Sequence, residues 1–421
     1  MQYYNIHSHI FTMNNAPRRF LHLYLPDPVA DAIDKITNTK FGAWLVEKLL
    51  SNFGGNGGKR YASFLQIGKS KNQLEVFEDL MKQYNDDETM RFIALTMYME
   101  KCGADVSASG YEGQIEEILA VKKQYPDRLM IFLGIDPRWK LTGPELRKTV
   151  EAYFEKKLEI NAGRSVYPFT GLKVYPSTGF YSFDERLKET FEWAADNGVP
   201  VLSHCSYLGG IYSNDSGYIK GNLNPFDPYT GLYYTKPVYI KSKVSGIFSN
   251  KDATSNKNTC SYFMEPASYE SLLEYFHSRT GNPLKLCLAH FGGGNQISAT
   301  VSSNLSKEEK DPYGVKNRNW FLQVQDLLKA YKGLYTDISY ALWDKEIHPI
   351  LLAQLNDPEY GGRILFGTDF FLTEREQPER ETYNNFKTAA IEKTLSNYNN
   401  IRAWDQIAGK NIATFLQSKY C

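Results

Sequence analysis

Tyr3-Tyr4-Asn5-Ile6-His7-Ser8-His9 is an apolar run that ends in a His-x-His pair. In a β-strand, side chains two residues apart lie on the same face, so His7 and His9 direct two imidazoles toward one point. Imidazole is the commonest protein ligand for zinc and related metals. This segment therefore predicts a strand whose end carries two metal ligands.

Seven further short apolar runs follow, each rich in β-forming residues. They are Arg91–Met99, Arg128–Asp136, Gly171–Tyr175, Pro200–Cys205, Lys285–Phe291, Leu334–Ser339 and Arg363–Asp369. Amphipathic segments lie between the runs, most clearly Glu112–Tyr125, Pro144–Ile160, Asp184–Asn197, Ser268–Thr280 and Asn319–Tyr331. Alternating strands and helices imply parallel pairing. We expect an α/β fold, a closed (β/α)₈ TIM barrel, with an open doubly wound sheet as the competing arrangement.

Two long insertions break the regular spacing of this pattern. Residues 12–90 follow the first strand and include the helical-looking stretch Pro28–Leu50, while residues 206–266 follow the fifth strand and show little periodicity. Long loops in a compact fold are usually functional, and loops that follow barrel strands emerge at the mouth where active sites lie. We predict one domain over residues 1–421, with a helical insertion after strand one and an irregular lid after strand five.

Charge and cysteine usage exclude several classes of protein. The 421 residues contain 48 Lys and Arg against 48 Asp and Glu, which argues against a nucleic-acid binder. No apolar stretch approaches the roughly 18–20 residues that span a bilayer, and no leader pattern is visible, so we expect a cytoplasmic protein without a membrane partner. The five cysteines are odd in number and lack a CxxC pattern, which disfavours a disulfide framework or a thiolate zinc site.

Reactive side chains recur within or at the ends of five of the eight runs. They are His7 and His9 in the first run, Lys173 in the fourth, His204 in the fifth, His290 in the sixth and Asp369 in the eighth. A barrel would bring these six residues to one mouth. Imidazoles with a carboxylate suit Zn²⁺, Mn²⁺ or Fe²⁺, and such an ion activates bound water.

With these residues in this order, the chain resembles the amidohydrolase superfamily. The motifs are the His-x-His pair, His-Phe-Gly-Gly-Gly from His290 and the Gly-Thr-Asp that ends at Asp369. It is most similar to the amidohydrolase-2 branch, which contains hydrolases and metal-dependent non-oxidative decarboxylases. The resemblance extends to Gly409-Lys410-Asn411-Ile412-Ala413. It implies that His7, His9, His204 and Asp369 hold one metal ion, and that His290 polarises the substrate or moves a proton.

Lys173 leaves the number of metal ions open. The resemblance also covers two-metal relatives, in which a strand-four lysine is carbamylated and bridges the ions, with His204 and His290 on the second ion. A second interpretation makes Lys173 a barrel residue that reaches toward solvent or pairs with a carboxylate. We favour one ion over two, with zinc as the expected metal and manganese or iron as alternatives.

Other residues are expected around this centre. Arg138 follows the third run and could hold a substrate carboxylate through a bidentate pair, although a salt bridge to a neighbouring loop is an equal alternative. Tyr175 is expected to contact the substrate. Asp337 is expected to orient the strand-one or strand-six histidine. The remaining histidines are expected at the surface: His22, His277 and His348.

These expectations combine into a metal-dependent hydrolase. Asp369 would take a proton from a metal-activated water and return it to the leaving group, while the metal or His290 would stabilise the oxyanion. The substrate would be a small polar or anionic amide, lactone or ester. One alternative is a decarboxylase of the same superfamily, and another is a non-catalytic binding barrel. A homo-oligomer is possible.

Overall fold

A computed structural model describes residues 1–19, 70, 72–85, 87–161, 163–207, 209–234, 260–300 and 319–421. In these ranges, eight parallel strands form one sheet in the order β1-β2-β3-β6-β7-β10-β11-β12. Their bounds are Tyr3–Ser8, Met90–Leu95, Leu129–Ile135, Gly171–Val174, Val201–Ser203, Leu286–Leu288, Leu334–Asp337 and Ile364–Leu365. Each of the eight predicted runs contains or overlaps one strand, which confirms the eight-stranded expectation.

The two ends of this sheet meet and close it. Ile6 N donates to Phe366 O at 3.0 Å, Asp369 N donates to His7 O at 2.8 Å, and an isolated parallel bridge joins Ser8 to Phe370. We call this contact between β1 and the segment after β12 the seam. Because β1 bonds to the segment that continues β12, the sheet closes into a barrel and the open doubly wound alternative is wrong.

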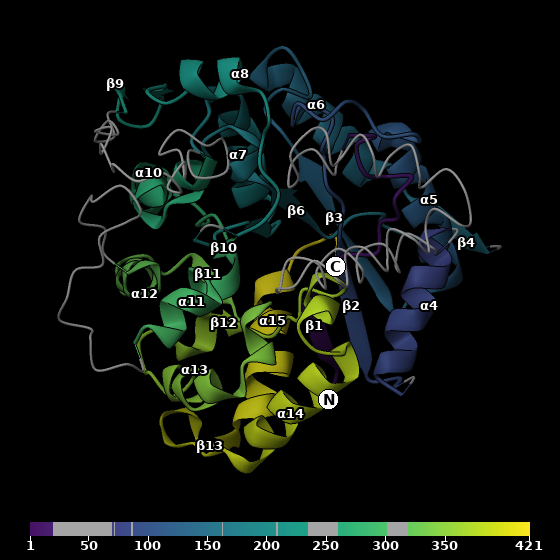
Figure 1. Ribbon diagram of the computed structural model, residues 1–421, viewed down its shortest axis with the longest axis vertical. Helices are drawn as coiled ribbons and strands as arrows, with labels where there is room; N and C mark the ends of the chain where they lie inside the picture. The colour runs from purple at the N-terminus through teal and green to yellow at the C-terminus, as the bar shows by residue number, and fades with distance from the viewer. Residues whose placement is uncertain are drawn as a thin grey trace, which may run out of the picture.

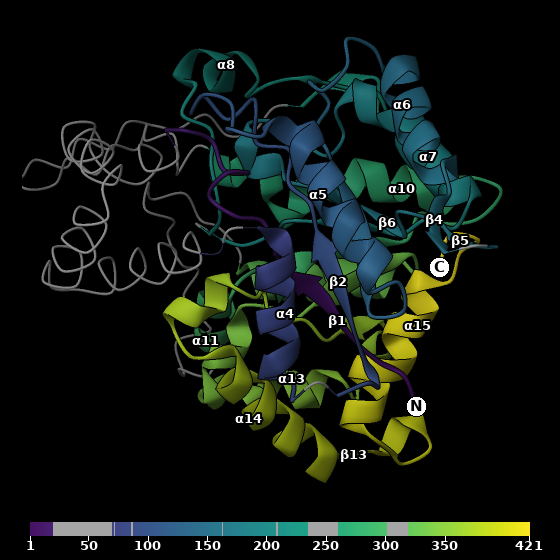
Figure 2. The ribbon, with the colours of Figure 1, turned by 90° about the vertical axis from the view of Figure 1, so that its right-hand side faces the viewer.

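Helices surround the strands on the outside (Figure 1). They are α4 Gln73–Gln83, α5 Gly110–Gln124, α6 Gly143–Glu155, α7 Glu185–Asp196, α8 Ser216–Gly221, α10 Glu270–Ser278, α11 Gly294–Ser298, α12 Trp320–Ala330, α13 His348–Gln354, α14 Glu379–Glu392 and α15 Asn411–Leu416. Both chain termini lie on the right in Figure 2, and α8 and α11, which follow strand ends, lie on the left. The mouth of the barrel therefore opens on the left in that view. No helix in the described ranges is long and apolar enough to cross a membrane.

Local sequence accounts for where these helices begin and end. Asp184, the first residue of the expected helix Asp184–Asn197, caps α7 by accepting from Arg186 N. The expected helix Pro144–Ile160 is too long, because α6 ends at Glu155 and Leu158–Asn161 forms β4. The buried positions of α6 stop at Phe154, so no apolar side chain holds a further turn against the barrel. β4 instead pairs with β5, Arg164–Val166, as an antiparallel hairpin.

The insertions are described only in part. The first ends with α4, while the predicted helix Pro28–Leu50 lies outside the described residues. The described part of the second contains α8 and the hairpin β8–β9, Phe226–Asp227 and Leu232–Tyr233. A last hairpin, β13–β14, spans Thr394–Leu395 and Ile401–Arg402. Among the three remaining histidines, His277 is exposed, His22 lies outside the described residues, and the surface prediction for His348 is wrong because its ring is buried and contacts Leu342 O.

Candidate metal centre

Three predicted ligands meet across the seam. His7 Nε2 lies 3.4 Å and His9 Nε2 3.3 Å from the same oxygen, Asp369 Oδ1. One ligand atom from each of the three residues lies within 4.8 Å of the other two, and all three side chains are buried. We call these residues the seam group. Atoms about 2.1 Å from a common ion lie within this separation of one another, so the spacing is that of a metal site.

The protonation states of His7 and Asp369 favour a bound cation in the seam group over hydrogen bonds within it. His7 Nδ1 lies 3.0 Å from Asp337 Oδ2, and this contact places the ring proton on Nδ1. His7 Nε2 then carries a lone pair, and it faces the carboxylate oxygen Asp369 Oδ1. Neither atom has a hydrogen-bond partner among the described residues. Two buried acceptors that face each other repel unless a cation lies between them, which is the arrangement a divalent metal would satisfy.

The pKa values support the same protonation states. Burial, with help from nearby Lys173, lowers the pKa of His7 to about 3, so the ring is neutral. Burial disfavours the charge of Asp369, but the neighbouring His7 and His9 outweigh burial and hold the pKa of this carboxyl below its usual range. Neutral imidazole and ionised carboxylate are the forms that bind a metal ion.

Asp337 and Ser339 tie the seam group to His290. Asp337 Oδ1 accepts from the backbone N–H groups of His290 and Ser339, both at 3.0 Å, while its Oδ2 contacts His7. The Ser339 hydroxyl lies 3.0 Å from His7 Nδ1 and 2.9 Å from His290 Nδ1. The expectation that Asp337 orients a strand-one or strand-six histidine is confirmed, and it contacts both. Ser339 was missed, because a serine two residues after a buried carboxylate gives no signal in the sequence.

Backbone strain concentrates at the strand ends that carry this centre. His290, Tyr340 and Asp369 have positive φ angles of 66°, 61° and 63°, which non-glycine residues rarely adopt. Close packing adds to this constraint at Gly367, where a Cβ atom would lie 2.8 Å from His7 Cβ. The glycine of the Gly-Thr-Asp motif is therefore needed for the approach of β12 to His7.

The other predicted residues lie next to the seam group, and the ring centroids of His290 and His7 are 4.8 Å apart. We call Lys173, His204 and His290 the facing group. His204 Nδ1 lies 3.0 Å from His290 Nε2, and the His204 ring stacks on Tyr175 with centroids 4.3 Å apart. Burial, reinforced by His290, lowers the pKa of His204 well below its usual value. Among the described residues, His204 belongs to no set of three side chains spaced as metal ligands, whereas His290 forms one with His7 and Asp337. The ligand role that the resemblance implied for His204 stays a prediction.

Lys173 lies deep under the histidines. Its side chain is 1 % exposed, its Nζ has no hydrogen-bond partner among the described residues, and Nζ lies 5.4 Å from the centroid of the Tyr175 ring. Burial lowers the pKa of Lys173 to about 8, although the charges of Asp337 and Asp369 partly offset this. Lys173 therefore neither pairs directly with a carboxylate nor reaches solvent, so the structure does not support the second interpretation.

Arg138 is engaged away from the seam group. Its Nε donates to Asp136 Oδ1 at 2.7 Å, its Nη1 donates to the carbonyls of Lys101 and Thr178, and the guanidinium lies 4.8 Å from the Tyr218 ring centroid. A substrate carboxylate would have to displace Asp136 from a buried pair. The geometry favours the salt bridge over the substrate-binding role.

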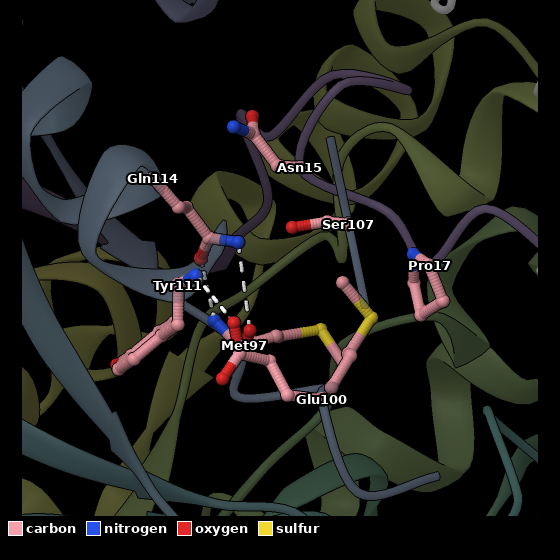
Figure 3. Close-up of a pocket in the computed structure, with 8 residues that line it drawn as sticks. Asn15, Pro17, Met97, Glu100, Ser107, Tyr111 and Gln114 are labelled. Carbon is pink, nitrogen blue, oxygen red and sulfur yellow. Dashed lines mark hydrogen bonds between the residues drawn. The ribbon is translucent and has the colours of Figure 1, made fainter. Parts of the chain in front are cut away.

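A pocket opens onto both groups. It has a volume of about 90 Å³, and its lining comprises His9, Tyr175, His204, Ser206, Gly209, Gly210, His290, Tyr340, Asp369 and Leu372. A second hollow lies between the segment after β1 and the loop after β2 (Figure 3). There Gln114 accepts from Met97 N at 2.8 Å and Glu100 accepts from Tyr111 N at 2.9 Å, which leaves no room for a ligand. The pocket beside the seam group is the better binding site.

Comparison with known proteins agrees with this architecture. A family model described as Amidohydrolase matches residues 78–397. No curated protein matches the sequence. Similar solved structures include an uncharacterized TIM-barrel protein from Bordetella bronchiseptica, 14% identical over 99% of this chain and 98% of that chain with a TM-score of 0.51. An amidohydrolase from Burkholderia multivorans is 10% identical over 99% of both chains, also with a TM-score of 0.51.

A third structure is a 5-carboxyvanillate decarboxylase from Sphingomonas paucimobilis, 13% identical over 99% of both chains with a TM-score of 0.47. At these identities the likeness to solved structures concerns the fold alone. The family model covers about three quarters of the chain, and it was found independently of the side-chain geometry. This chain therefore belongs to the amidohydrolase family of metal-dependent TIM-barrel enzymes.

Proposed function

We propose that this protein is a hydrolase that uses one divalent metal ion to cleave an amide, lactone or ester bond of a small substrate. The observation that carries the proposal is the seam group, in which two imidazole nitrogens approach one buried, unpartnered carboxylate oxygen at 3.3 and 3.4 Å. We assign His7, His9 and Asp369 as the protein ligands. Three protein ligands leave a coordination position open, as catalytic metal sites require.

When bound, such an ion would polarise a carbonyl and lower the pKa of water toward 7. Asp369 has a second role in this proposal. Its Oδ1 faces the two histidines, while its Oδ2 remains to accept the proton of an attacking water and to return it to the leaving atom. The lowered pKa of Asp369 keeps the carboxylate ionised before that transfer.

The facing group would bind and position the substrate. Burial lowers the pKa of His290, so its ring is neutral. Its Nδ1 lies 3.2 Å from the Ser339 carbonyl, which places the ring proton on Nδ1 and leaves Nε2, the atom now bonded to His204, as an acceptor. Asp337 holds the backbone N–H of the same residue. We therefore assign His290 to accepting a proton at Nε2 during the reaction. Tyr175 would form one wall of the substrate pocket.

The decisive experiment combines metal analysis with product analysis. Purified protein should contain about one zinc, manganese or iron ion per chain, and a chelator should abolish hydrolysis of an active compound from a panel of lactones, esters and amides. Added Zn²⁺ or Mn²⁺ should restore it. Protein that contains no metal and gains none on incubation with these ions would instead favour the non-catalytic binding barrel.

Decarboxylation is the second candidate, because the same three ligands could hold an ion that binds a substrate carboxylate. A parallel panel of aromatic and enoic acids separates the two reactions. Release of CO₂ or bicarbonate by the metal-loaded protein, together with no hydrolysis, would replace the hydrolase assignment and leave the metal site unchanged.

A further inference from the structure

A buried polar cluster lies directly behind the seam group and takes no part in the proposed chemistry. It contains Asn5 of β1, Tyr84 after α4, Thr368 before Asp369, and Glu379 at the start of α14. Each of these side chains is at most 1 % exposed. Three parts of the chain that are distant in the sequence, around residue 5, around residue 84 and at 368–379, therefore meet through polar side chains in a place where an apolar core would be expected.

The hydrogen bonds of this cluster can be assigned a direction. Asn5 Nδ2 donates to the hydroxyls of Tyr84 at 2.9 Å and Thr368 at 2.8 Å, so both of its hydrogens are used. Each hydroxyl then directs its own hydrogen elsewhere, and both donate to Glu379 Oε1 at 2.6 Å. Glu379 is thus the common acceptor, and without it two buried donors would lose their partner.

Among the described residues, no cation balances the charge of Glu379. No ion pair joins it to a Lys, Arg or His among the described residues, and burial raises its pKa to about 7. A buried carboxylate without a cation lowers stability, so its presence calls for a role that an apolar residue could not fill. The hydrogen bonds suggest that this role is to accept from Thr368 and Tyr84 together.

The cluster reaches both sides of the seam through one side chain. Asn5 Oδ1 accepts from His7 N at 3.2 Å and from Thr368 N at 3.3 Å. His7 lies two residues after Asn5, and Asp369 follows Thr368 directly. The main chain beside each of these two ligands is therefore fixed by the same carboxamide, which Glu379 holds in turn through Thr368 and Tyr84.

We propose that Glu379 is a positioning residue for the metal site, which acts through Thr368 and Asn5 to set how Asp369 and His7 face each other across the seam. This inference rests on the proposed function, because it takes His7 and Asp369 as metal ligands. Groups that orient metal ligands typically change metal affinity about 10- to 100-fold when removed. The effect is expected here from residues that touch no ligand side chain.

Two pairs of variants test the proposal by titration of the metal-free protein with Co²⁺, whose visible spectrum reports ligand geometry. Glu379→Leu and Thr368→Val should weaken Co²⁺ binding about 10- to 100-fold and alter the spectrum. Glu379→Gln and Thr368→Ser keep the acceptor and the hydroxyl, and both should bind within about threefold of wild type. Co²⁺ affinity of Thr368→Val equal to that of wild type would overturn the proposal, as would a loss in Glu379→Gln as large as in Glu379→Leu.

Thr96→Val is the matched control. Thr96 is a buried threonine after β2 whose hydroxyl accepts from Gly134 N at 2.7 Å and lies 3.1 Å from Phe132 O, with no contact to the seam group. This variant should lose comparable stability without loss of Co²⁺ affinity. An equal loss of Co²⁺ affinity in Thr96→Val would mean that general destabilisation explains the weaker binding, and it would refute the positioning role of Glu379.

Hydrogen exchange of the metal-free proteins keeps this inference separable from the proposed function. In Thr368→Val, amides in peptides that cover residues 5–9 and 366–371 should exchange faster than in wild type, and in Thr96→Val they should not. If wild type bound no Co²⁺, the proposed metal function would fail, and this exchange pattern alone would decide the positioning role. Unchanged exchange in Thr368→Val would refute it.

Discussion

The seam group and the facing group each contain two histidines, but the third residue is a carboxylate in the seam group and a lysine in the facing group, and their lone pairs point differently. In the seam group, two imidazole nitrogens approach one carboxylate oxygen, and among the described residues His7 Nε2 and Asp369 Oδ1 have no hydrogen-bond partner. In the facing group, His204 and His290 are bonded to each other and no carboxylate lies between them. The difference shows that a cluster of histidines does not by itself make a metal site. The lone pairs of the ligand atoms must also point to one position, and no hydrogen-bonding proton may occupy that position.

The contrast between the seam group and the facing group also bears on the number of metal ions in the site. A second ion in the facing group would need Lys173 to carry an added carboxylate, and Lys173 has no hydrogen-bond partner in the described structure. The seam group needs no such change. One ion at the seam, with the facing group turned to the substrate, is the arrangement that we propose.

The largest expected effect comes from removing a seam ligand. His9→Gln should lower Zn²⁺ affinity by more than about 100-fold, beyond the range typical of residues that only support a ligand. The measurement is Zn²⁺ titration of metal-free protein against a chromophoric competitor. His348→Gln is the control, because His348 is also buried but its Nε2 bonds to Leu342 O at 2.9 Å, away from the mouth. Near-wild-type affinity in His9→Gln would remove the seam group from the metal site.

A smaller effect on metal affinity is expected from the facing group. His204→Gln should change Zn²⁺ affinity by less than about tenfold, since His204 is bonded to His290 rather than to the seam group. The same variant should lower kcat/KM by about 100-fold or more, because His204 contacts the ring nitrogen of His290 that is proposed to accept a proton. A loss of Zn²⁺ affinity as large as in His9→Gln would restore His204 as the fourth ligand and move the metal toward the facing group.

Lys173→Met should leave the metal content unchanged and alter only the pH dependence of stability. Burial lowers the pKa of Lys173 from 10.5 to about 8 in the folded protein. Between those values the unfolded chain binds a proton at Lys173 that the folded protein lacks, so the free energy of unfolding should rise with pH across this window. Lys173→Met removes this rise, and below pH 8 its unfolding free energy should exceed that of wild type by up to about 3 kcal/mol.

Denaturant unfolding of the metal-free proteins between pH 7 and pH 10.5 measures this difference. Lys122→Met is a suitable control, because burial also lowers the pKa of Lys122 to about 8, but its Nζ donates to the carbonyls of Pro126 and Leu129. That variant should gain no stability, since it loses two hydrogen bonds. A fall from two metal ions to one in Lys173→Met would instead support the two-ion arrangement with a modified lysine.

Local patterns were sufficient to predict the barrel and the strand ends. Residues two apart share a face in any strand, so His7 and His9 could be paired from the sequence alone. Apolar runs that alternate with helices imply parallel strands, whose carboxyl ends share one side, so Asp369 could be expected near His7. Asp337 could likewise be expected to orient a histidine, because the strand that carries Asp337 ends on the same side of the barrel as the strands that carry His7 and His290.

The tertiary structure alone decided which of these residues touch. His204 and His290 pair with each other, Arg138 is held by Asp136, and Ser339 bridges two histidines, and none of these contacts follows from spacing along the chain. Each depends on side-chain directions across neighbouring strands, which the register and twist of the whole barrel set.

The seam shows most clearly which features the sequence determines and which the tertiary structure decides. Sequence determined that His7 and Asp369 lie at the ends of the first and last strands, because alternation along a strand is local. Whether those ends meet within bonding distance of one ion depends on barrel closure and on the contacts of Asn5 with Thr368 and of Tyr84 with Glu379, which join segments more than 280 residues apart. Hydrogen bonds between residues so far apart in the sequence form only when the chain has folded, so no local sequence pattern could predict them.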